Sequence, residues 1–285
     1  MSGATDARGR AQLASIARLV AEEAGALVMA GFRARPRAEE KGTWDLVTEF
    51  DRASQDLVLA RLASLAPGIP VVAEEASDGT TKDQPGLVFY VDPLDGTTNF
   101  VHGHPFFAVA VGLMDDGAPV VGAVVAPALG VTWIGWVDAD AEPGARRRGA
   151  ALRDGAPCST SSIDALGRAM LATGFPPQRD KAPENNFGSF LSVKRVAQAV
   201  RRCGSAAIDL CFVADGTYDG YWERKLHVWD LCAAGAIALA AGATITNLDG
   251  SPPDYHAGTI AASNGLVHAA LLDAIARGAP LTGTY

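Results

Sequence analysis

The chain has 285 residues, of which 48% are hydrophobic and 20% charged, so it can bury a sizeable core and leaves little room for long disorder. Its formal net charge of −8 argues against direct binding of nucleic acid or of an anionic membrane. The four cysteines show no CxxC pairing and no zinc-site spacing, which indicates reduced thiols and not a disulfide framework.

The N-terminal part predicts a pair of helices. Apolar residues at helical spacing, with charges between them, predict a long amphipathic helix from about Ala7 to Arg33. Those charges distinguish it from a signal peptide or a membrane span, so we expect a cytoplasmic protein. After a loop, a second helix is expected, with Thr48 able to cap it and Gly68 closing it.

Apolar runs rich in β-branched residues predict a mostly antiparallel sheet after these helices. The expected strands begin at Pro70 and Gly86, flank a hairpin turn at Asp116-Gly117, cover VTWIGWV and include the stretch around Arg146 to Leu152. Residues 1–150 are thus expected to form a helix pair plus a sheet.

The second half alternates strands and helices, which predicts another α/β layer. Strands are expected near Met170, at YDGYWE, near Thr244 and near Ile260; helices are expected from about Glu184, at SAAIDLCFVADG, at DLCAAGAIALAAG and from about Leu266. We therefore predict an α/β protein, α+β in residues 1–150 and α/β in residues 151–285, which together form one compact catalytic unit.

The stretch YVDPLDGTTNF places two carboxylates at the end of an apolar strand. Pro93 is expected to stop the strand from simply continuing after Asp92, and Gly96 lets the backbone turn before a short helix. Asp92 and Asp95 then lie at the mouth of the sheet, where their mutual repulsion is costly unless positive charge is present.

Further carboxylates occur at comparable places. Glu74 and Glu75 end a neighbouring strand, Asp230 begins an Ala-rich helix and Asp51 lies in the first turn of the second helix. Each has a structural explanation alone, as a solvated or a capping residue. If they converge, however, an all-oxygen cluster suits Mg²⁺ or Mn²⁺ better than zinc.

Six segments carry a resemblance to a known family. In order they are WDLVTEFD, AEE, DPLDGTTNF, GSAAIDLCFVADG, YWE and WDLCAAGAIALAAGA. They closely resemble the inositol monophosphatase family of Mg²⁺-dependent, lithium-sensitive phosphatases, from about Lys41 to the final helix. The resemblance implies a layered αβαβα sandwich of the sugar-phosphatase type, and a homodimer.

The resemblance also implies the metal ligands. Glu74, Asp92 and the backbone carbonyl of Leu94 correspond to ligands of a first Mg²⁺, and Asp92, Asp95 and Asp230 to ligands of a second. A third, weaker ion is expected near Glu74, so two to three ions per chain are implied, with Mn²⁺ as a possible substitute.

The catalytic residues implied by the resemblance are Asp51, Thr97 and Glu74. Thr97 and Asp51 match the pair that orients the attacking water, Thr97 through its hydroxyl and Asp51 by accepting that hydroxyl's proton. Two cations could bind the phosphate, lower the pKa of a bound water and neutralise the leaving alkoxide. The amides of Gly96 and Thr97 could add neutral donors to the phosphate.

The substrate side is implied by five residues. Glu223 matches a position that accepts hydrogen bonds from inositol hydroxyls, which favours a polyol over a nucleotide. Gly204, Ser205 and Ala206 match the loop and helix start that line the same pocket, although Ser205 could simply cap that helix. Asp230 is expected to reach the substrate as well as the metal.

The sequence allows two interpretations of each of three neighbouring residues. Arg224 and Lys225 either face solvent or approach a second anionic group, which would favour a bisphosphate such as fructose 1,6-bisphosphate. His227 either touches the substrate or is structural.

We therefore expect hydrolysis of inositol 1-phosphate and related small polyol monophosphates, with no membrane partner. The alternatives are fructose-1,6-bisphosphatase, histidinol-phosphate phosphatase, phosphoadenosine-phosphate phosphatase, and a regulatory protein-binding role known in some bacterial relatives. The D-x-x-D spacing and the absence of any GxxxxGK[ST] loop argue against phosphoaspartate enzymes and P-loop enzymes.

Overall fold

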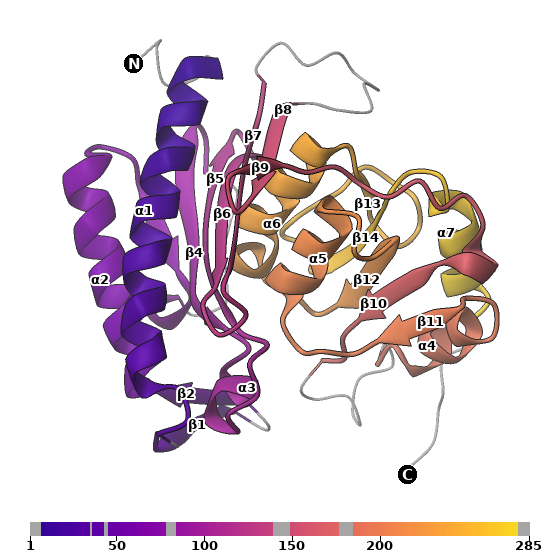
Figure 1. The fold of residues 1–285 in the computed structure, drawn as a ribbon, viewed down its shortest axis with the longest axis horizontal. Coiled ribbons are helices and arrows are strands. Elements are labelled where there is room, and N and C mark those ends of the chain that lie inside the picture. The colour runs from indigo at the N-terminus through magenta and orange to yellow at the C-terminus, as the bar shows by residue number, and fades with distance from the viewer. Residues whose placement is uncertain are drawn as a thin grey trace.

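The computed structural model describes residues 7–34, 36–42, 45–77, 84–138, 149–176 and 185–278. Five layers lie side by side: a pair of helices, a sheet, a second pair of helices, a second sheet and two outer helices (Figure 1). Three apolar clusters fill the spaces between these layers. This arrangement confirms the predicted α/β class and the αβαβα sandwich.

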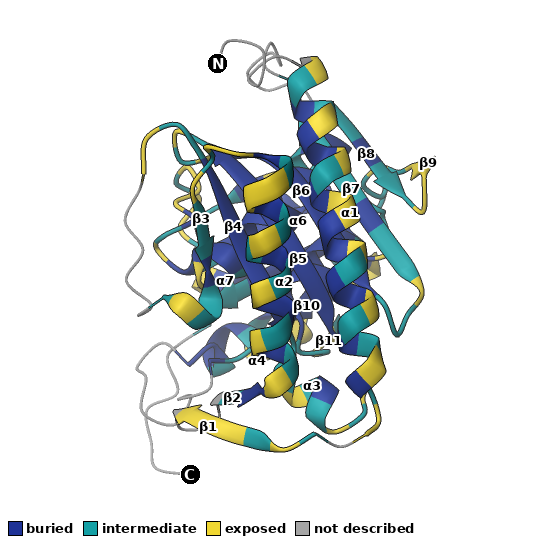
Figure 2. Cartoon of the chain, turned by 90° about the vertical axis from the view of Figure 1, so that its left-hand side faces the viewer, coloured by how far each residue is buried: buried dark blue, intermediate teal, exposed yellow. Residues whose placement is uncertain are grey.

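The first layer is the expected helix pair, α1 (Ala7–Gly31) and α2 (Glu49–Leu65). Their apolar sides pack on the sheet and their exposed sides face solvent (Figure 2). The loop expected before α2 is instead partly a two-stranded antiparallel hairpin of β1 (Ala38–Gly42) and β2 (Asp45–Thr48). Thr48 caps α2, as predicted.

The second layer is a seven-stranded sheet in the order β3-β4-β5-β6-β7-β8-β9. Its strands are β3 (Val71–Ala73), β4 (Leu87–Asp95), β5 (Ala108–Asp115), β6 (Ala118–Ala126), β7 (Val131–Val137), β8 (Gly149–Arg153) and β9 (Ala156–Pro157). Among the described strand pairs of this sheet, only β3–β4 is parallel. Part of the stretch expected from Arg146 lies outside the described residues. The sheet extends past residue 150, and the division of the chain at that residue stays a prediction.

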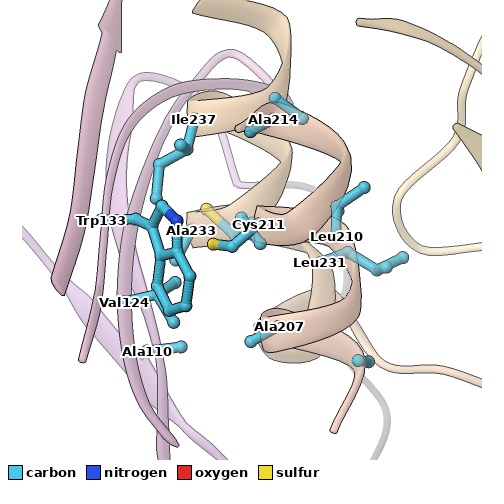
Figure 3. Packing of buried hydrophobic residues seen from close by; sticks show 14 of the residues in the cluster. Ala110, Val124, Trp133, Ala207, Leu210, Cys211, Ala214, Leu231, Ala233 and Ile237 are labelled. Carbon is cyan, nitrogen blue, oxygen red and sulfur yellow. The ribbon is translucent and has the colours of Figure 1, made fainter. Parts of the chain in front are cut away.

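The central layer consists of α5 (Ala206–Ala214) and α6 (Val228–Ala241), which lie between the two sheets (Figure 1). Small residues let α6 approach the first sheet closely. Gly112, Gly122 and Gly135 are successive cross-strand partners in β5, β6 and β7. A Cβ on Gly122 would lie 1.9 Å from the carbonyl oxygen of Ala233 in α6. Figure 3 shows Ala233 and Ile237 beside Val124 and Trp133 of the sheet.

The fourth layer is a five-stranded sheet in the order β11-β10-β12-β14-β13. Its strands are β10 (Met170–Thr173), β11 (Ala199–Arg201), β12 (Gly220–Arg224), β13 (Thr244–Thr246) and β14 (Thr259–Ser263). The outer helices are α4 (Phe187–Lys194) and α7 (His268–Ala276), and short helical turns occur at η1 (Glu74–Ala76), α3 (Thr97–Val101) and η2 (Leu166–Arg168). The start expected for α4 at Glu184 lies outside the described residues.

The cysteines are free, as predicted; Cys211 and Cys232 are buried, and Cys158 and Cys203 are half-buried. In the described ranges, the helices are all too short or too polar to cross a membrane.

Candidate active site

The first carboxylates lie at the end of β4. The prediction that Pro93 stops this strand is wrong, because β4 continues to Asp95 with a shift in its register to β5 between Asp92 and Asp95. The proline therefore bends the strand instead of ending it. The turn follows at Gly96, which has a φ of 89° and opens α3, as expected.

Glu74 and Glu75 reach the same edge because β3 runs parallel to β4, with Ala73 opposite Val91. Lys41, from the end of β1, contacts both glutamates: its Nζ lies 3.1 Å from Oε1 of Glu74 and closer still to Glu75. The ammonium group of Lys41 therefore provides positive charge beside Glu74 and Glu75.

Asp230 approaches from the other side of the sheet, in the first turn of α6. Its Oδ2 accepts a hydrogen bond from the amide of His227 at 2.7 Å, which holds the carboxylate at the helix N-terminus. The closely packed glycines of the first sheet determine how deeply α6, and therefore Asp230, is placed.

Asp95 connects the two halves of the chain. Its Oδ2 accepts hydrogen bonds from the hydroxyl of Ser205 at 2.5 Å and from the amide of Ala207 at 2.8 Å, at the start of α5. Ser205 also caps α5 by accepting a hydrogen bond from the amide of Ile208. The interpretation of Ser205 as a cap is correct, and the same hydroxyl holds Asp95.

These carboxylates interact electrostatically. Burial raises the pKa of Asp92 well above its usual range, and the charges of Glu74, Asp95 and Asp230 raise it further. Burial raises the pKa of Asp230 in the same way, with Glu74 and Asp95 adding to the shift. It also raises the pKa of Asp95 to about 6 and that of Glu74 to about 7. The cluster is therefore short of positive charge.

Within the part of the chain that the structure describes, no three or more His, Cys, Asp or Glu side chains stand in a geometry that could hold one metal ion. Two contacts already described occupy part of the set, Lys41 on Glu74 and Ser205 on Asp95. The donors are all carboxylate oxygens, and the charges of Glu74 and Asp95 raise the pKa of both Asp92 and Asp230, so their chemistry fits a hard divalent cation.

Asp51 and Thr97 form a hydrogen-bonded pair beside this cluster. The hydroxyl of Thr97 donates to Oδ1 of Asp51 at 2.9 Å, and the carbonyl of Leu94 lies 3.1 Å from the same hydroxyl. Oδ2 of Asp51 accepts from both the amide and the hydroxyl of Thr48, at 2.8 and 2.6 Å. Asp51 is 1% exposed, and this burial raises its pKa.

Among the residues expected to bind the substrate, Glu223 lies near the end of β12, and its Oε2 accepts a hydrogen bond from Tyr221 at 2.5 Å. Burial raises the pKa of Glu223 to about 7, and the charge of Asp95 adds to the shift. Gly204 precedes α5 and has a φ of 85°. The side-chain amide of Asn99 contacts the carbonyl of Gly204 at 3.2 Å.

The structure shows the surroundings of the three residues for which the sequence allowed two interpretations. Arg224 follows Glu223 in the strand, so its side chain leaves the opposite face of the sheet. Lys225 is exposed, with a φ of 62°. His227 is also exposed, and its ring stacks on Trp229 with centroids 4.7 Å apart.

Sequence reasoning missed several residues at this site. Lys41 and Asn99 act through contacts with distant parts of the chain, which no local pattern reveals. Asp209 in α5 is 1% exposed, and its Oδ1 has no hydrogen-bond partner among the described residues. Burial raises its pKa well above the usual range, and Glu223 and Asp95 add to the shift. An aspartate inside an apolar helical run was the available signal.

Comparison with known proteins identifies the family. Residues 10–279 match the model of the inositol monophosphatase family. The chain is 37% identical over 254 residues to an inositol-1-monophosphatase of Synechocystis, covering 89% of this chain and 85% of that relative. It is also 34% identical over 270 residues to a Nus factor SuhB of Pseudomonas aeruginosa, covering 92% of this chain and 94% of that relative.

A solved inositol monophosphatase from Anabaena superposes with a TM-score of 0.81 at 33% identity, covering 94% of this chain and 97% of that one. The carboxylate-rich edge between the two sheets, the matching model and these relatives agree. The chain belongs to the inositol monophosphatase family and is a phosphatase of that family.

Proposed function

We propose that this phosphatase hydrolyses inositol 1-phosphate and related polyol monophosphates to the alcohol and inorganic phosphate, with Mg²⁺ as the cofactor. The observation that carries the proposal is the proximity of four carboxylates: the charges of Glu74, Asp95 and Asp230 raise the pKa of Asp92, and those of Glu74 and Asp95 raise the pKa of Asp230. Such a set favours a divalent cation, and a cation-rich site in turn favours a phosphate.

The proposed ligands are those that the sequence indicated. Glu74, Asp92 and the carbonyl of Leu94 would hold one ion, and Asp92, Asp95 and Asp230 a second. A third ion near Glu74 would have to compete with Lys41 for that carboxylate. Bound ions supply Lewis-acid activation of a water and neutralise charge on the phosphate and the leaving oxygen.

The chain's own residues then position the attacking water. The Thr97 hydroxyl donates to Asp51, so its lone pairs can accept a hydrogen bond from that water. As the water loses a proton to Thr97, the hydroxyl proton passes to Oδ1 of Asp51, whose raised pKa favours the transfer. The charge of Asp51 also acts on Glu74, raising its pKa, so Glu74 is proposed to orient the same water.

Substrate binding uses neutral donors and one carboxylate. The amides of Gly96 and Thr97, after the left-handed turn, are the proposed donors to the phosphate. Glu223 accepts hydrogen bonds from the hydroxyls of the alcohol, while Gly204, Ser205 and Ala206 line the pocket beside it. Asp230 is proposed to contact the substrate as well as the ion.

The test is phosphate release from inositol 1-phosphate with and without Mg²⁺, and with Li⁺ added. We expect activity that depends on Mg²⁺, is replaced partly by Mn²⁺ and is inhibited by Li⁺. A panel with fructose 1,6-bisphosphate, histidinol phosphate and phosphoadenosine phosphate tests the alternatives. Preference for the adenine nucleotide would remove the polyol argument, and near-normal turnover of Asp95→Asn would contradict the metal assignment.

A second candidate role is regulation through a protein partner, which the similarity to a Nus factor SuhB favours. The negative net charge favours a protein partner over direct contact with nucleic acid. We further propose a homodimer, as the resemblance implies, located in the cytoplasm, as the charged N-terminal helix indicates; sedimentation of the purified chain tests the dimer.

A further inference from the structure

The carboxylate of Glu223 lies directly against Gly174, the residue that follows β10. An ideal Cβ on Gly174 would lie 1.9 Å from Oε1 of Glu223 and 2.2 Å from its Cδ. Gly174 does not adopt a left-handed backbone conformation. The backbone conformation is therefore one that residues other than glycine adopt, and a Cβ here would have to displace the carboxylate of Glu223.

A buried polar network holds the backbone of Gly174 in place. The side-chain amide of Asn186 donates to the carbonyl of Gly174 at 2.7 Å and to the hydroxyl of Thr173 at 2.8 Å. Its oxygen accepts from the indole of Trp222 at 2.9 Å. The Thr173 hydroxyl donates to the carbonyl of Trp222 at 2.6 Å, so the network ties β10 to the residue before Glu223.

The network is rigid because its residues are buried and their hydrogen-bonding groups are paired. Thr173 and Trp222 have no exposed surface, and Asn186 is 3% exposed. Each hydrogen-bonding group of the Asn186 side chain has a partner. Buried networks whose members are all satisfied fix one arrangement of the surrounding chain.

The second carboxylate oxygen of Glu223, Oε2, would lie 2.2 Å from the same Cβ and is also held by a hydrogen bond. Oε2 accepts from the hydroxyl of Tyr221 at 2.5 Å, and Tyr221 is completely buried. Tyr221 thus holds Glu223 through Oε2, and both oxygens of the carboxylate lie against Gly174. Its remaining lone pairs point in a direction that the protein determines before any ligand binds.

We propose that Gly174 is a specificity-determining residue. Because Gly174 has no side chain, the carboxylate of Glu223 can occupy the position from which it accepts hydrogen bonds from the hydroxyls of a polyol phosphate. Asn186 is a positioning residue, because its hydrogen bond to the carbonyl of Gly174 holds that backbone in place. The proposal rests on the function proposed above, in which Glu223 accepts hydrogen bonds from the alcohol.

The test compares two substrates, inositol 1-phosphate and 4-nitrophenyl phosphate, which has no hydroxyl groups to bind. The measured quantity is the ratio of their kcat/KM values with Mg²⁺ present. In Gly174→Ala this ratio should fall about tenfold to a hundredfold, mainly through a higher KM for inositol 1-phosphate, as expected for loss of hydrogen bonds to a charged group. The matched control is Gly167→Ala, because a Cβ there meets only the carbonyl of Val196 at 3.8 Å.

A double-mutant cycle separates positioning from general damage. Once Glu223→Ala has removed the carboxylate, adding Gly174→Ala should change the ratio no further. If Gly174→Ala does not fold, the pair Gly174→Ala with Glu223→Asp replaces it, since the shorter side chain leaves room for the methyl group. That pair should match Glu223→Asp alone.

Three results would overturn the proposal: a ratio in Gly174→Ala equal to that in Gly167→Ala, losses that multiply in the double variant, or a replacement pair with a lower ratio than Glu223→Asp alone. Failure of the proposed function looks different. In that case the wild type would show no preference for inositol 1-phosphate, or Glu223→Ala would leave the ratio unchanged.

Discussion

Thr97 has one hydroxyl proton and two acceptors in reach, Oδ1 of Asp51 at 2.9 Å and the carbonyl of Leu94 at 3.1 Å. If the carbonyl of Leu94 is engaged as a ligand, Asp51 is the acceptor that remains. Thr48 already holds the other oxygen of Asp51. The capping box of α2 therefore positions the proposed proton acceptor, so Asp51 combines a structural role with a proposed catalytic one.

Replacing the Thr97 hydroxyl by a methyl group tests this role. Thr97→Val keeps the shape of the side chain but removes the proton path, so kcat should fall by about 10²–10⁴, the usual range for lost general acid–base catalysis. KM should change little. The measurement is steady-state hydrolysis of inositol 1-phosphate at saturating Mg²⁺.

The neighbouring residue provides the control. Thr98 is exposed, and no side-chain contact of it with Asp51 occurs in the described structure, so Thr98→Val should stay close to wild type. Equal losses in both variants would indicate damage to α3 and would contradict the proton path. Thr97→Ser, which keeps the hydroxyl, should recover most of the activity.

At the scale of the elements, the central helix α6 depends on the glycines of the sheet below it. Gly112, Gly122 and Gly135 form a continuous line across three strands. A Cβ on Gly112 would lie 2.5 Å from the amide nitrogen of Ala233, and one on Gly135 would lie 3.0 Å from the Cα of Ile237. Their missing side chains let the helix backbone rest on the sheet.

Gly122→Ala tests this close packing, because its methyl group would lie 1.9 Å from the carbonyl oxygen of Ala233. Overpacking of this kind costs about 1–3 kcal/mol, which lowers the melting temperature by about 2–4 °C per kcal/mol in a chain of this size. Since Asp230 lies at the start of α6, Mn²⁺ should also bind more weakly. Calorimetry and titration with Mn²⁺ measure the two effects.

Gly167→Ala again provides the matched control, and both quantities should remain at their wild-type values in it. A melting temperature unchanged by Gly122→Ala would contradict the close approach of α6. A lower melting temperature with unchanged Mn²⁺ affinity would instead show that the position of Asp230 does not depend on this contact.

Local signals predicted most elements, and distant contacts account for the differences. The turn residues Asp116 and Gly117 predicted their hairpin, and Thr48 predicted the start of α2. The β1–β2 hairpin was missed because charged residues dominate β1. Pro93 was interpreted as a strand end, but the partner strand β5 accommodates it through a shift in register.

At the scale of the whole molecule, the site also combines residues that local patterns predict with contacts that they do not predict. Carboxylates at strand ends and helix starts could be found from local patterns, because their positions in single elements are local properties. Their neighbours could not, since Lys41 meets Glu74 and Ser205 meets Asp95 only when the five layers assemble. The contact between Glu223 in β12 and Gly174, which follows β10, likewise forms only when these two strands of the second sheet pair.

The acidic cluster makes the stability of the metal-free protein depend on pH. A carboxyl group whose pKa is higher in the folded than in the unfolded state stabilises the fold at low pH, and that contribution is lost as pH rises through the folded value. The folded values are about 6 for Asp95 and about 7 for Glu74. For these two groups the loss falls between about pH 4 and pH 7, the interval from the ordinary carboxyl pKa to the folded values.

Glu74→Gln isolates this effect in protein treated with a chelator. Because glutamine stays neutral, the variant should gain stability relative to wild type as the pH rises from 5 to 7.5. Mg²⁺ at a hundredfold excess over its Kd should stabilise the wild type at pH 7.5 by about 2.7 kcal/mol, and should stabilise it less at pH 5, where protons compete for the ligands. Calorimetry at both pH values, with NaCl at matched ionic strength as the control, measures this. A Mg²⁺ effect that is independent of pH, or one that NaCl reproduces, would contradict a cluster whose missing charge is supplied by a bound divalent ion.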